Sequence, residues 1–165
     1  MMGVGKTTAG RLLAEALGWP HVDSDEEAVR VAGKPFTEIW EEGGEPGFRS
    51  LEVRVVAELA NRPGPAVVAL GGGAVLDDRN REAIKKAGMV VWLRADPSTL
   101  SNRVGDGAGR PLLKDGPAQA LRHLSEARAP LYESVSDLIF DVDRSNPREV
   151  AHQIADAVRR QQCVS

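Results

Sequence analysis

The chain opens with Met1-Met2-Gly3-Val4-Gly5-Lys6-Thr7-Thr8, which is the most informative part of the sequence for predicting the fold. Its second half fits the phosphate-binding pattern G-x-x-x-x-G-K-[ST], in which backbone N–H groups and a helix N-terminus face phosphate oxygens. We expect Lys6 to reach the β- and γ-phosphates of a nucleotide, and the Thr7 hydroxyl to ligate a bridging Mg²⁺ ion. The stretch therefore predicts a phosphate-binding loop.

A helix is expected directly after this loop. Apolar residues follow the i, i+3, i+4, i+7, i+8 spacing of an amphipathic helix that Gly18 ends, at Ala9, Leu12, Leu13, Ala16 and Leu17. Two features depart from the usual motif. The first glycine of the pattern would stand one position before Met1, and no apolar strand precedes the loop. We therefore expect a sequence that begins late, through truncation or a late start codon.

The composition points to a single domain over residues 1–165. A formal charge of −3 argues against a general nucleic-acid or membrane-surface binder. Cys163 is the single cysteine of the sequence, which excludes a disulfide framework and fits a reducing cytosol. Because no apolar run is long enough to span a membrane, we expect a cytoplasmic protein without nucleic-acid or membrane partners.

Short apolar runs alternate with helical patterns, which is typical of a parallel α/β sheet wound by right-handed crossovers. Strands are expected over residues 19–23, 66–70, 89–93 and 138–142. Helices are expected over 35–42, 45–61, 78–87 and 118–129, the last one stopped by Pro130, and after the Asn146-Pro147 cap. Ligands of such a sheet bind at the carboxyl ends of its strands, where Asp23 and Gly71–Gly73 fall. The three glycines allow close approach of a ligand, or form a permissive loop.

Two carboxylates follow the first of these strands. Asp23 closes the strand, at the edge where a carboxylate can face the Mg²⁺ of a nucleotide. Ser24 and Glu27 predict a capping box, with Ser24 as the N-cap of a helix. Asp25 lies in the first turn of that helix, where the dipole alone can explain a carboxylate. For Asp25 the residues leave a structural and a functional interpretation equally open.

Three arginines are candidates for binding anions. Arg49 stands near the start of the helix over 45–61, where a cation is locally unfavourable unless an anion is near. A solvated arginine paired with a neighbouring glutamate is the alternative. Arg110 follows a Gly-rich stretch that could close over a nucleotide, although ordinary flexible loops have the same composition. Arg128 lies in the last turn of the helix over 118–129, where the helix dipole also favours a cation.

Together these features resemble the shikimate kinases, small P-loop kinases of the nucleoside-monophosphate-kinase type. The likeness lies in Gly3-Val4-Gly5-Lys6-Thr7-Thr8, Val22-Asp23-Ser24-Asp25, Gly47-Phe48-Arg49, Leu70-Gly71-Gly72-Gly73-Ala74-Val75, Gly109-Arg110-Pro111-Leu112-Leu113 and Arg128-Ala129-Pro130-Leu131-Tyr132. These stretches follow the order of the family across nearly the whole chain. The resemblance implies a monomeric phosphotransferase that moves the γ-phosphoryl group of ATP to the 3-hydroxyl of shikimate, with Mg²⁺, in aromatic amino-acid biosynthesis.

The resemblance also implies residue roles. Asp25 would hold the ring hydroxyls and orient or deprotonate the attacking one, between substrate-binding helices at about 24–61. Lys6 and Arg110 would be catalytic too, with Arg110 contacting the ATP phosphates from a lid at about 104–116. The substrate would be held by Asp25, Arg49 and Arg128, with its ring lined by Gly71, Gly72 and Gly73. The implied ATP-binding residues are Gly3, Val4, Gly5, Lys6, Thr7, Thr8, Arg110, Asn146 and Pro147. Mg²⁺ would bind Thr7 directly and Asp23 through water.

The fold implied by the resemblance is α/β, a three-layer P-loop kinase fold with a five-stranded parallel sheet in the order 2-3-1-4-5. Strand 1 is missing from this chain, and it would lie between the strands expected at 66–70 and 89–93. Its neighbours would lose ladder hydrogen bonds and an apolar slot would open between them. We therefore expect residues 1–165 alone to be poorly stable or inactive, and a version extended upstream by a strand to be active.

Two other functions stay open at this point. Another small-metabolite kinase, such as a gluconate kinase, shares the phosphate loop and also binds a substrate carboxylate. A nucleotide-binding module without turnover is compatible with the incomplete loop. The glycine run and the stretch from Arg128 to Tyr132 favour shikimate. ADP release that depends on added shikimate would separate the three functions.

Overall fold

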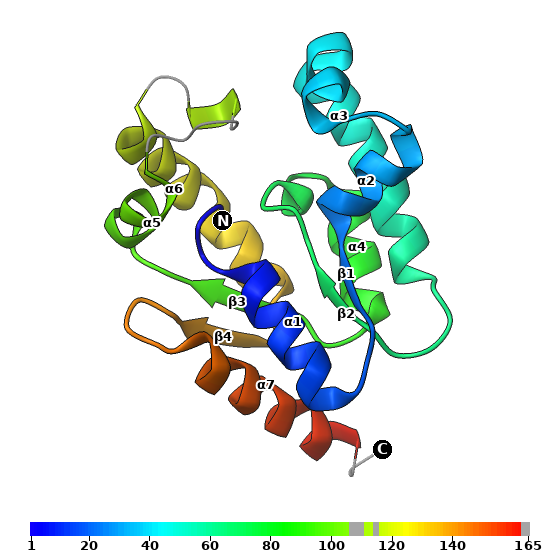
Figure 1. Ribbon diagram of the computed structural model, residues 1–165, viewed down its shortest axis with the longest axis vertical. Helices are drawn as coiled ribbons and strands as arrows, with labels where there is room; N and C mark the ends of the chain where they lie inside the picture. Colours follow the sequence, from blue (N-terminus) through cyan, green and yellow to red (C-terminus); the bar gives the residue numbers. More distant parts are fainter. Residues whose placement is uncertain (106–110, 114–115, 163–165) are drawn as a thin grey trace.

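The computed structural model describes residues 1–105, 111–113 and 116–162 (Figure 1). Its strands are β1 (His21–Asp23), β2 (Val67–Ala69), β3 (Val91–Arg94) and β4 (Leu138–Asp141). Its helices are α1 (Lys6–Leu17), α2 (Ser24–Ala32), α3 (Phe36–Ala60), α4 (Asp78–Ala87), α5 (Pro97–Val104), α6 (Pro117–Val135) and α7 (Pro147–Gln162), with 3-10 turns η1 (Ala74–Leu76) and η2 (Pro111–Leu113). No helix among the described residues is long and apolar enough to cross a membrane.

The strands form two parallel pairs. β1 pairs with β2, with His21 opposite Val67, and β3 pairs with β4, with Val91 opposite Leu138. Among the described residues no ladder joins β2 to β3, and Figure 1 shows the two pairs apart with α1 crossing between them. In the family order 2-3-1-4-5, β1 and β2 correspond to strands 2 and 3, and β3 and β4 correspond to strands 4 and 5. The place of the central strand 1 is between β2 and β3.

An apolar groove of about 670 Å³ separates the two pairs. Both inner strands contribute to its walls, together with residues from the helices on either face, including Val67, Val68, Val91, Leu13, Ile84 and Ile154. The slot predicted from the sequence is therefore present at the predicted place. Its effect on stability and activity stays a prediction.

The helices cover the strands and hold the loops at their carboxyl ends. α1 packs on β2 and on α7, α3 packs on α2 and α4, and α6 packs on α5. The largest buried cluster joins α1, α5, α6 and α7 through Leu13, Leu100, Leu121, Val135 and Ile154. Burial of such side chains is the main favourable contribution to folding, so these contacts fix α6 relative to the phosphate loop.

The two helices expected over 35–42 and 45–61 are present as α3, which bends sharply in its middle. Gly44 has φ 58° and ψ −164°, a conformation that glycine adopts without steric cost. Phe36, Trp40 and Phe48 lie on both sides of this bend and pack against one another, with ring centroids 5.0 to 6.0 Å apart. The bend thus folds α3 back on its own aromatic residues, and Arg49 lies near the start of the second arm, directly after Phe48.

The expected end of a helix at Pro130 is wrong. α6 continues through Pro130 to Val135, and Ser136 caps it. The proline removes one backbone donor, but the buried face of the helix runs on past it to Tyr132 and Val135. Tertiary burial outweighs the local signal here. Arg128 is therefore not in a last turn, and the helix dipole does not account for it.

Candidate active site

The phosphate loop begins the site. Gly3 and Gly5 have φ of 73° and 93°, and Gly5 is the N-cap of α1 in the left-handed conformation. No side chain caps this helix end, so its first backbone N–H groups can donate to an anion. The loop leaves no room for a side chain at Gly3, where an added Cβ would lie 2.7 Å from Val104 Cγ2. Helix α5 therefore packs against the phosphate loop at Gly3.

Asp23 ties this loop to the second helix. Its Oδ2 accepts a hydrogen bond from the Thr7 hydroxyl at 3.0 Å, and its Oδ1 accepts one from the backbone N–H of Asp25 at 3.0 Å. Asp23, not Ser24 as expected, is thus the N-cap of α2. The side chain of Ser24 is used elsewhere, because its Oγ accepts a hydrogen bond from the Gly71 N–H at 2.8 Å. The predicted metal residues, Thr7 and Asp23, are in direct contact.

The glycine run at 71–73 touches all three expected substrate-binding side chains. A Cβ added at Gly71 would lie 2.6 Å from Asp25 Oδ1, and one added at Gly73 would overlap the Arg49 guanidinium. The Gly72 carbonyl accepts a hydrogen bond from Arg128 Nη1 at 3.1 Å. A side chain at 71 or 73 would occupy the space of these functional groups, so one of them would have to move. The side chains of Asp25, Arg49 and Arg128 therefore meet at this glycine run.

Arg49 is held by two glutamates on α3. Its Nη1 donates to Glu52 Oε2 at 2.8 Å, and its Nη2 donates to Glu45 Oε1 at 3.0 Å. Burial alone would lower the pKa of Arg49, but the charges of Glu52 and Glu45 raise it above its ordinary value. The neighbouring glutamates considered from the sequence are present, yet the arginine is not a solvated surface residue. It lies against Gly73 with its side chain 19% exposed.

Arg128 is more deeply buried, with only 4% of its surface exposed. Tyr132 follows one turn later on α6, and its hydroxyl donates to the same Gly72 carbonyl at 2.6 Å. Arg128 and Tyr132, on the same face of α6, therefore both donate to the carbonyl oxygen of Gly72. Because a guanidinium has five N–H donors, Arg128 keeps donors for an anion beside the glycine run.

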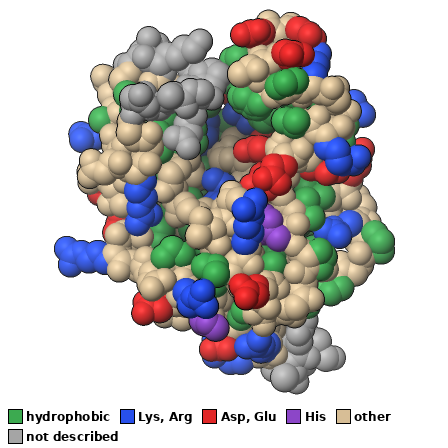
Figure 2. Space-filling model, in the orientation of Figure 1, with side chains coloured by type: hydrophobic (Ala, Val, Ile, Leu, Met, Phe, Trp, Pro, Cys, Tyr) green, Lys and Arg blue, Asp and Glu red, His purple; other side chains and the backbone are tan. Residues whose placement is uncertain are grey.

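The carboxyl of Asp25 has a raised pKa. The protein atoms around it desolvate the charge, which is the largest cause, and the nearby charge of Asp23 raises the pKa further. Lys6 and Arg49 act in the opposite direction. Asp25 is nevertheless among the exposed residues. Figure 2 shows a hollow with charged side chains between the α2–α3 arm and the side that carries α5 and α6.

Comparison with known proteins identifies the family of this site. The model of the family described as "SKI: Shikimate kinase" matches residues 2–159. The chain belongs to the shikimate kinase family. A shikimate kinase of Rhizobium meliloti (strain 1021) is 42% identical over 160 residues, which cover 94% of this chain and 83% of the relative. A shikimate kinase of Pseudomonas fluorescens (strain Pf0-1) is 42% identical over 156 residues, covering 94% and 90%.

Solved shikimate kinases also share the fold. The enzyme from Acinetobacter baumannii in complex with shikimate superposes with a TM-score of 0.89 and 38% identity, covering 97% of this chain and 89% of that one. The enzyme from Aquifex aeolicus gives a TM-score of 0.82 and 30% identity, covering 96% and 92%. The α/β P-loop kinase fold and the family predicted from the sequence are thus confirmed. Membership favours shikimate phosphorylation over gluconate kinase activity or a module without turnover.

Two further members of the predicted site lie at the start of α7. Asn146 caps α7, accepting a hydrogen bond from the Arg148 N–H at 2.9 Å, and Pro147 is the first residue of that helix, as predicted. α5 contacts both the phosphate loop, at Gly3, and the segment before Asn146, through Arg103 Nη2 donating to the Val142 carbonyl at 2.9 Å. Arg110 and most of the expected lid at 104–116 lie outside the described residues.

Two residues of the site had no role assigned from the sequence. Glu52 is 3% exposed and accepts a hydrogen bond from Arg49, and its Oε1 would lie 2.9 Å from a Cβ added at Gly71. Burial raises the pKa of the Glu52 carboxyl, while Arg49 counteracts the rise. Its spacing of three residues from Arg49 was the available signal. Tyr132 belongs to a stretch that carries the family likeness, but nothing local indicated what its hydroxyl binds.

Proposed function

We propose that this chain transfers the γ-phosphoryl group of ATP to the 3-hydroxyl group of shikimate, in the pocket between the phosphate loop and the Gly71–Gly73 run. The reaction class follows from membership in the shikimate kinase family. The observation that carries the residue roles is the convergence of Asp25, Arg49 and Arg128 on three consecutive glycines. One carboxylate and two guanidinium groups suit a substrate with ring hydroxyls and one carboxylate.

On the nucleotide side, the N–H groups at the start of α1 would bind the phosphates of ATP. Lys6 Nζ donates to the Met1 carbonyl at 2.9 Å, so its ammonium lies along the loop, where it can reach the β- and γ-phosphates. The remaining loop residues, Gly3, Val4, Thr7 and Thr8, would line the phosphates. Asn146 and Pro147 would border the adenine, and Arg110 would stabilise the charge of the transferring group.

On the acceptor side, Arg49 and Arg128 would bind the shikimate carboxylate, with Gly72 against the ring. Asp25 would accept a hydrogen bond from the 3-hydroxyl and take its proton as the oxygen attacks phosphorus. The oxygen–phosphorus bond forms while the bond from the γ-phosphorus to the bridging oxygen breaks, and ADP leaves with the electron pair. The raised pKa of Asp25 brings the carboxylate closer to the basicity that proton acceptance at neutral pH requires.

Kinases of this kind use ATP with a divalent cation, and we propose Mg²⁺ for this one. Thr7 and Asp23 present a hydroxyl and a carboxylate oxygen 3.0 Å apart beside the phosphate loop. Mg²⁺ prefers oxygen ligands and commonly combines one or two protein groups with phosphate oxygens and water, which this pair fits. Thr7 would bind it directly and Asp23 through water. When bound, the cation would neutralise charge on the β- and γ-phosphates.

The function is tested by measuring ADP release from ATP with each candidate substrate. We expect release that depends on shikimate, with a product phosphorylated on the 3-hydroxyl by ³¹P NMR. Release with gluconate instead would support the other kinase. ATP binding without release in the presence of either acid would support a module without turnover.

The metal proposal predicts a defined effect of Thr7→Ala. Losing the hydroxyl removes one expected ligand and frees Asp23, so the Mg²⁺ concentration for half-maximal activity should rise by about tenfold. Chelation of divalent cations should abolish ADP release in the unaltered chain, and added Mg²⁺ should restore it. Thr37→Ala, at an exposed threonine at the start of α3, is the matched control and should leave the Mg²⁺ dependence unchanged. An equal Mg²⁺ requirement in all three proteins would contradict the ligand assignment.

A further inference from the structure

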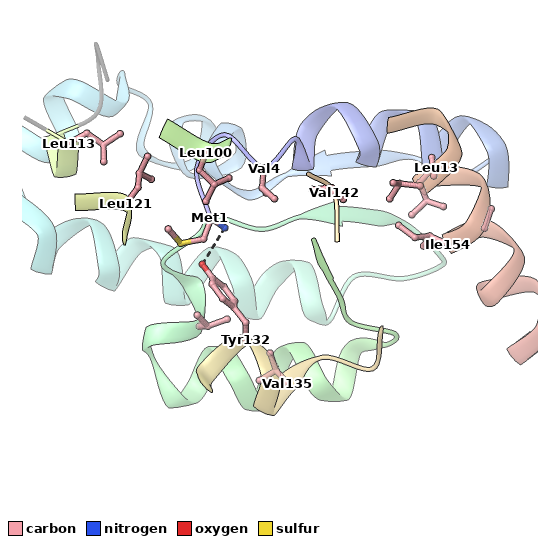
Figure 3. Close-up of a cluster of buried hydrophobic side chains, with 14 residues drawn as sticks. Met1, Val4, Leu13, Leu100, Leu113, Leu121, Tyr132, Val135, Val142 and Ile154 are labelled. Atoms are coloured by element: carbon pink, nitrogen blue, oxygen red, sulfur yellow. Dashed lines mark hydrogen bonds between the residues drawn. The ribbon is translucent and has the colours of Figure 1, made fainter. Parts of the chain in front are cut away.

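The hydroxyl of Tyr132 connects the two halves of the site. It donates to the Gly72 carbonyl at 2.6 Å and accepts from the Met1 amino group at 3.3 Å, a bond drawn dashed in Figure 3. The Met1 carbonyl in turn accepts from Lys6 Nζ at 2.9 Å. One phenol thus touches the backbone of both the phosphate loop and the glycine run.

We propose that Tyr132 is a positioning residue for shikimate: its hydroxyl fixes the Gly72 carbonyl, and through that carbonyl it fixes the Arg128 guanidinium. This inference rests on the proposed function. Tyr132 does not act on the reacting atoms in this proposal. It sets the place of the backbone and of the cation that bind the acceptor substrate.

The tyrosine ring is rigidly held. Its ring centroid lies 5.4 Å from that of Trp92 on β3, and the residue is 8% exposed within the main buried cluster. Figure 3 shows the ring reaching from α6 toward Met1 among buried apolar side chains. Burial raises the pKa of Tyr132, so the phenol is a neutral donor at neutral pH. A hydrogen bond from so fixed a donor defines where the carbonyl of Gly72 stands.

Arg128 is less constrained by itself. Its side chain has four rotatable bonds, and its guanidinium donates to the Gly72 carbonyl at 3.1 Å. A carbonyl oxygen has two lone pairs, so Tyr132 and Arg128 can use it together. If the tyrosine hydroxyl is absent, Arg128 is the remaining side-chain donor to that carbonyl among the described residues. The guanidinium and the glycine run can then both move away from the geometry that binds a carboxylate.

The test is Tyr132→Phe, which keeps the ring and its packing and removes the hydroxyl. We expect KM for shikimate to rise by about three- to tenfold, the equivalent of one hydrogen bond, while KM for ATP and kcat change by less than about twofold. Ser134→Ala removes another hydroxyl from α6, one that donates to the Leu131 carbonyl away from the site, and should leave both KM values unchanged. The melting temperatures of both variants should stay close to that of the parent.

A double-mutant cycle with Arg128→Lys separates positioning from loss of stability. Because Tyr132 acts through Arg128, the Phe substitution should raise KM for shikimate much less in the Lys background than in the parent. Equal effects in both backgrounds, an unchanged KM for shikimate, or equal increases in both KM values would each overturn the proposal. A parent protein without shikimate-dependent ADP release would instead refute the proposed function, so the two failures are distinguishable.

Discussion

Replacing Asp25 with asparagine is expected to lower kcat by about two orders of magnitude or more, while KM for ATP stays within about twofold. The amide keeps the shape of the side chain but cannot accept the proton of the attacking hydroxyl. The side chain lies against Gly71, beside the phosphate loop, and its cap hydrogen bond uses the backbone N–H of Asp25, which the substitution retains. Steady-state kinetics with each substrate varied in turn measures both parameters.

The matched control is Glu26→Gln on the same turn of α2. Glu26 is exposed and contributes only a surface ion pair with Arg11 at 3.6 Å, so its loss should leave kcat unchanged. If Asp25→Asn turned over as fast as the Glu26 variant, Asp25 would be only a first-turn carboxylate, the alternative left open by the sequence.

Asp25 also predicts how activity depends on pH. Its pKa is raised, above all by desolvation and then by the charge of Asp23, so the ionised form is lost at a higher pH than for an ordinary aspartate near about 3.9. Activity should therefore fall on acidification earlier than the ordinary value suggests, and the residual activity of Asp25→Asn should lack this limb. The same shift makes Asp25 favour folding only below its unfolded pKa, a contribution lost as pH rises through the folded pKa. Asp25→Asn should thus melt no lower than the parent at neutral pH.

Local sequence rules located the elements that their own residues determine. The glycines of the phosphate loop, the Gly18 stop and the Asn146-Pro147 cap are where the sequence predicted them, because each depends on a few neighbouring residues. The same holds for α4, whose predicted bounds 78–87 are those of the structure.

Long-range contacts were beyond such rules. Ser24 has an ordinary cap signature, yet its hydroxyl binds the N–H of Gly71, 47 positions away, and leaves the capping to Asp23. Pro130 is a local stop signal, yet Tyr132 and Val135 are buried and extend the helix beyond it. In both places a tertiary contact competes with a local preference and wins.

The site, too, depends on long-range contacts. Family motifs indicated Asp25, Arg49 and Arg128, but these residues meet at the glycine run only once the strands are assembled. Glu52 could not be assigned from its helix alone, because its role depends on Arg49 and Gly71 meeting beside it. Motifs indicate the groups that contact the substrate. They therefore do not identify residues whose role is to hold other functional residues.

Replacing Arg128 with alanine is expected to raise KM for shikimate by about a hundredfold and to leave KM for ATP within about twofold. A charge-assisted hydrogen bond contributes about 1.5–3 kcal/mol, and the upper value corresponds to about two orders of magnitude. The Gly72 carbonyl keeps its bond from Tyr132, so the glycine run stays paired. Arg122→Ala, at an exposed arginine of the same helix, is the control and should leave both KM values unchanged.

The carboxylate assignment is tested by pairing this variant with the methyl ester of shikimate. In the parent, the ester should bind far more weakly than the acid, because it offers no anion to Arg49 and Arg128. In Arg128→Ala the preference for the acid over the ester should shrink toward the part that Arg49 supplies alone. Arg128→Lys should lie between the two, since it keeps the charge but loses the planar fork. An undiminished preference for the acid in Arg128→Ala would mean that this buried arginine serves the glycine run and not the substrate.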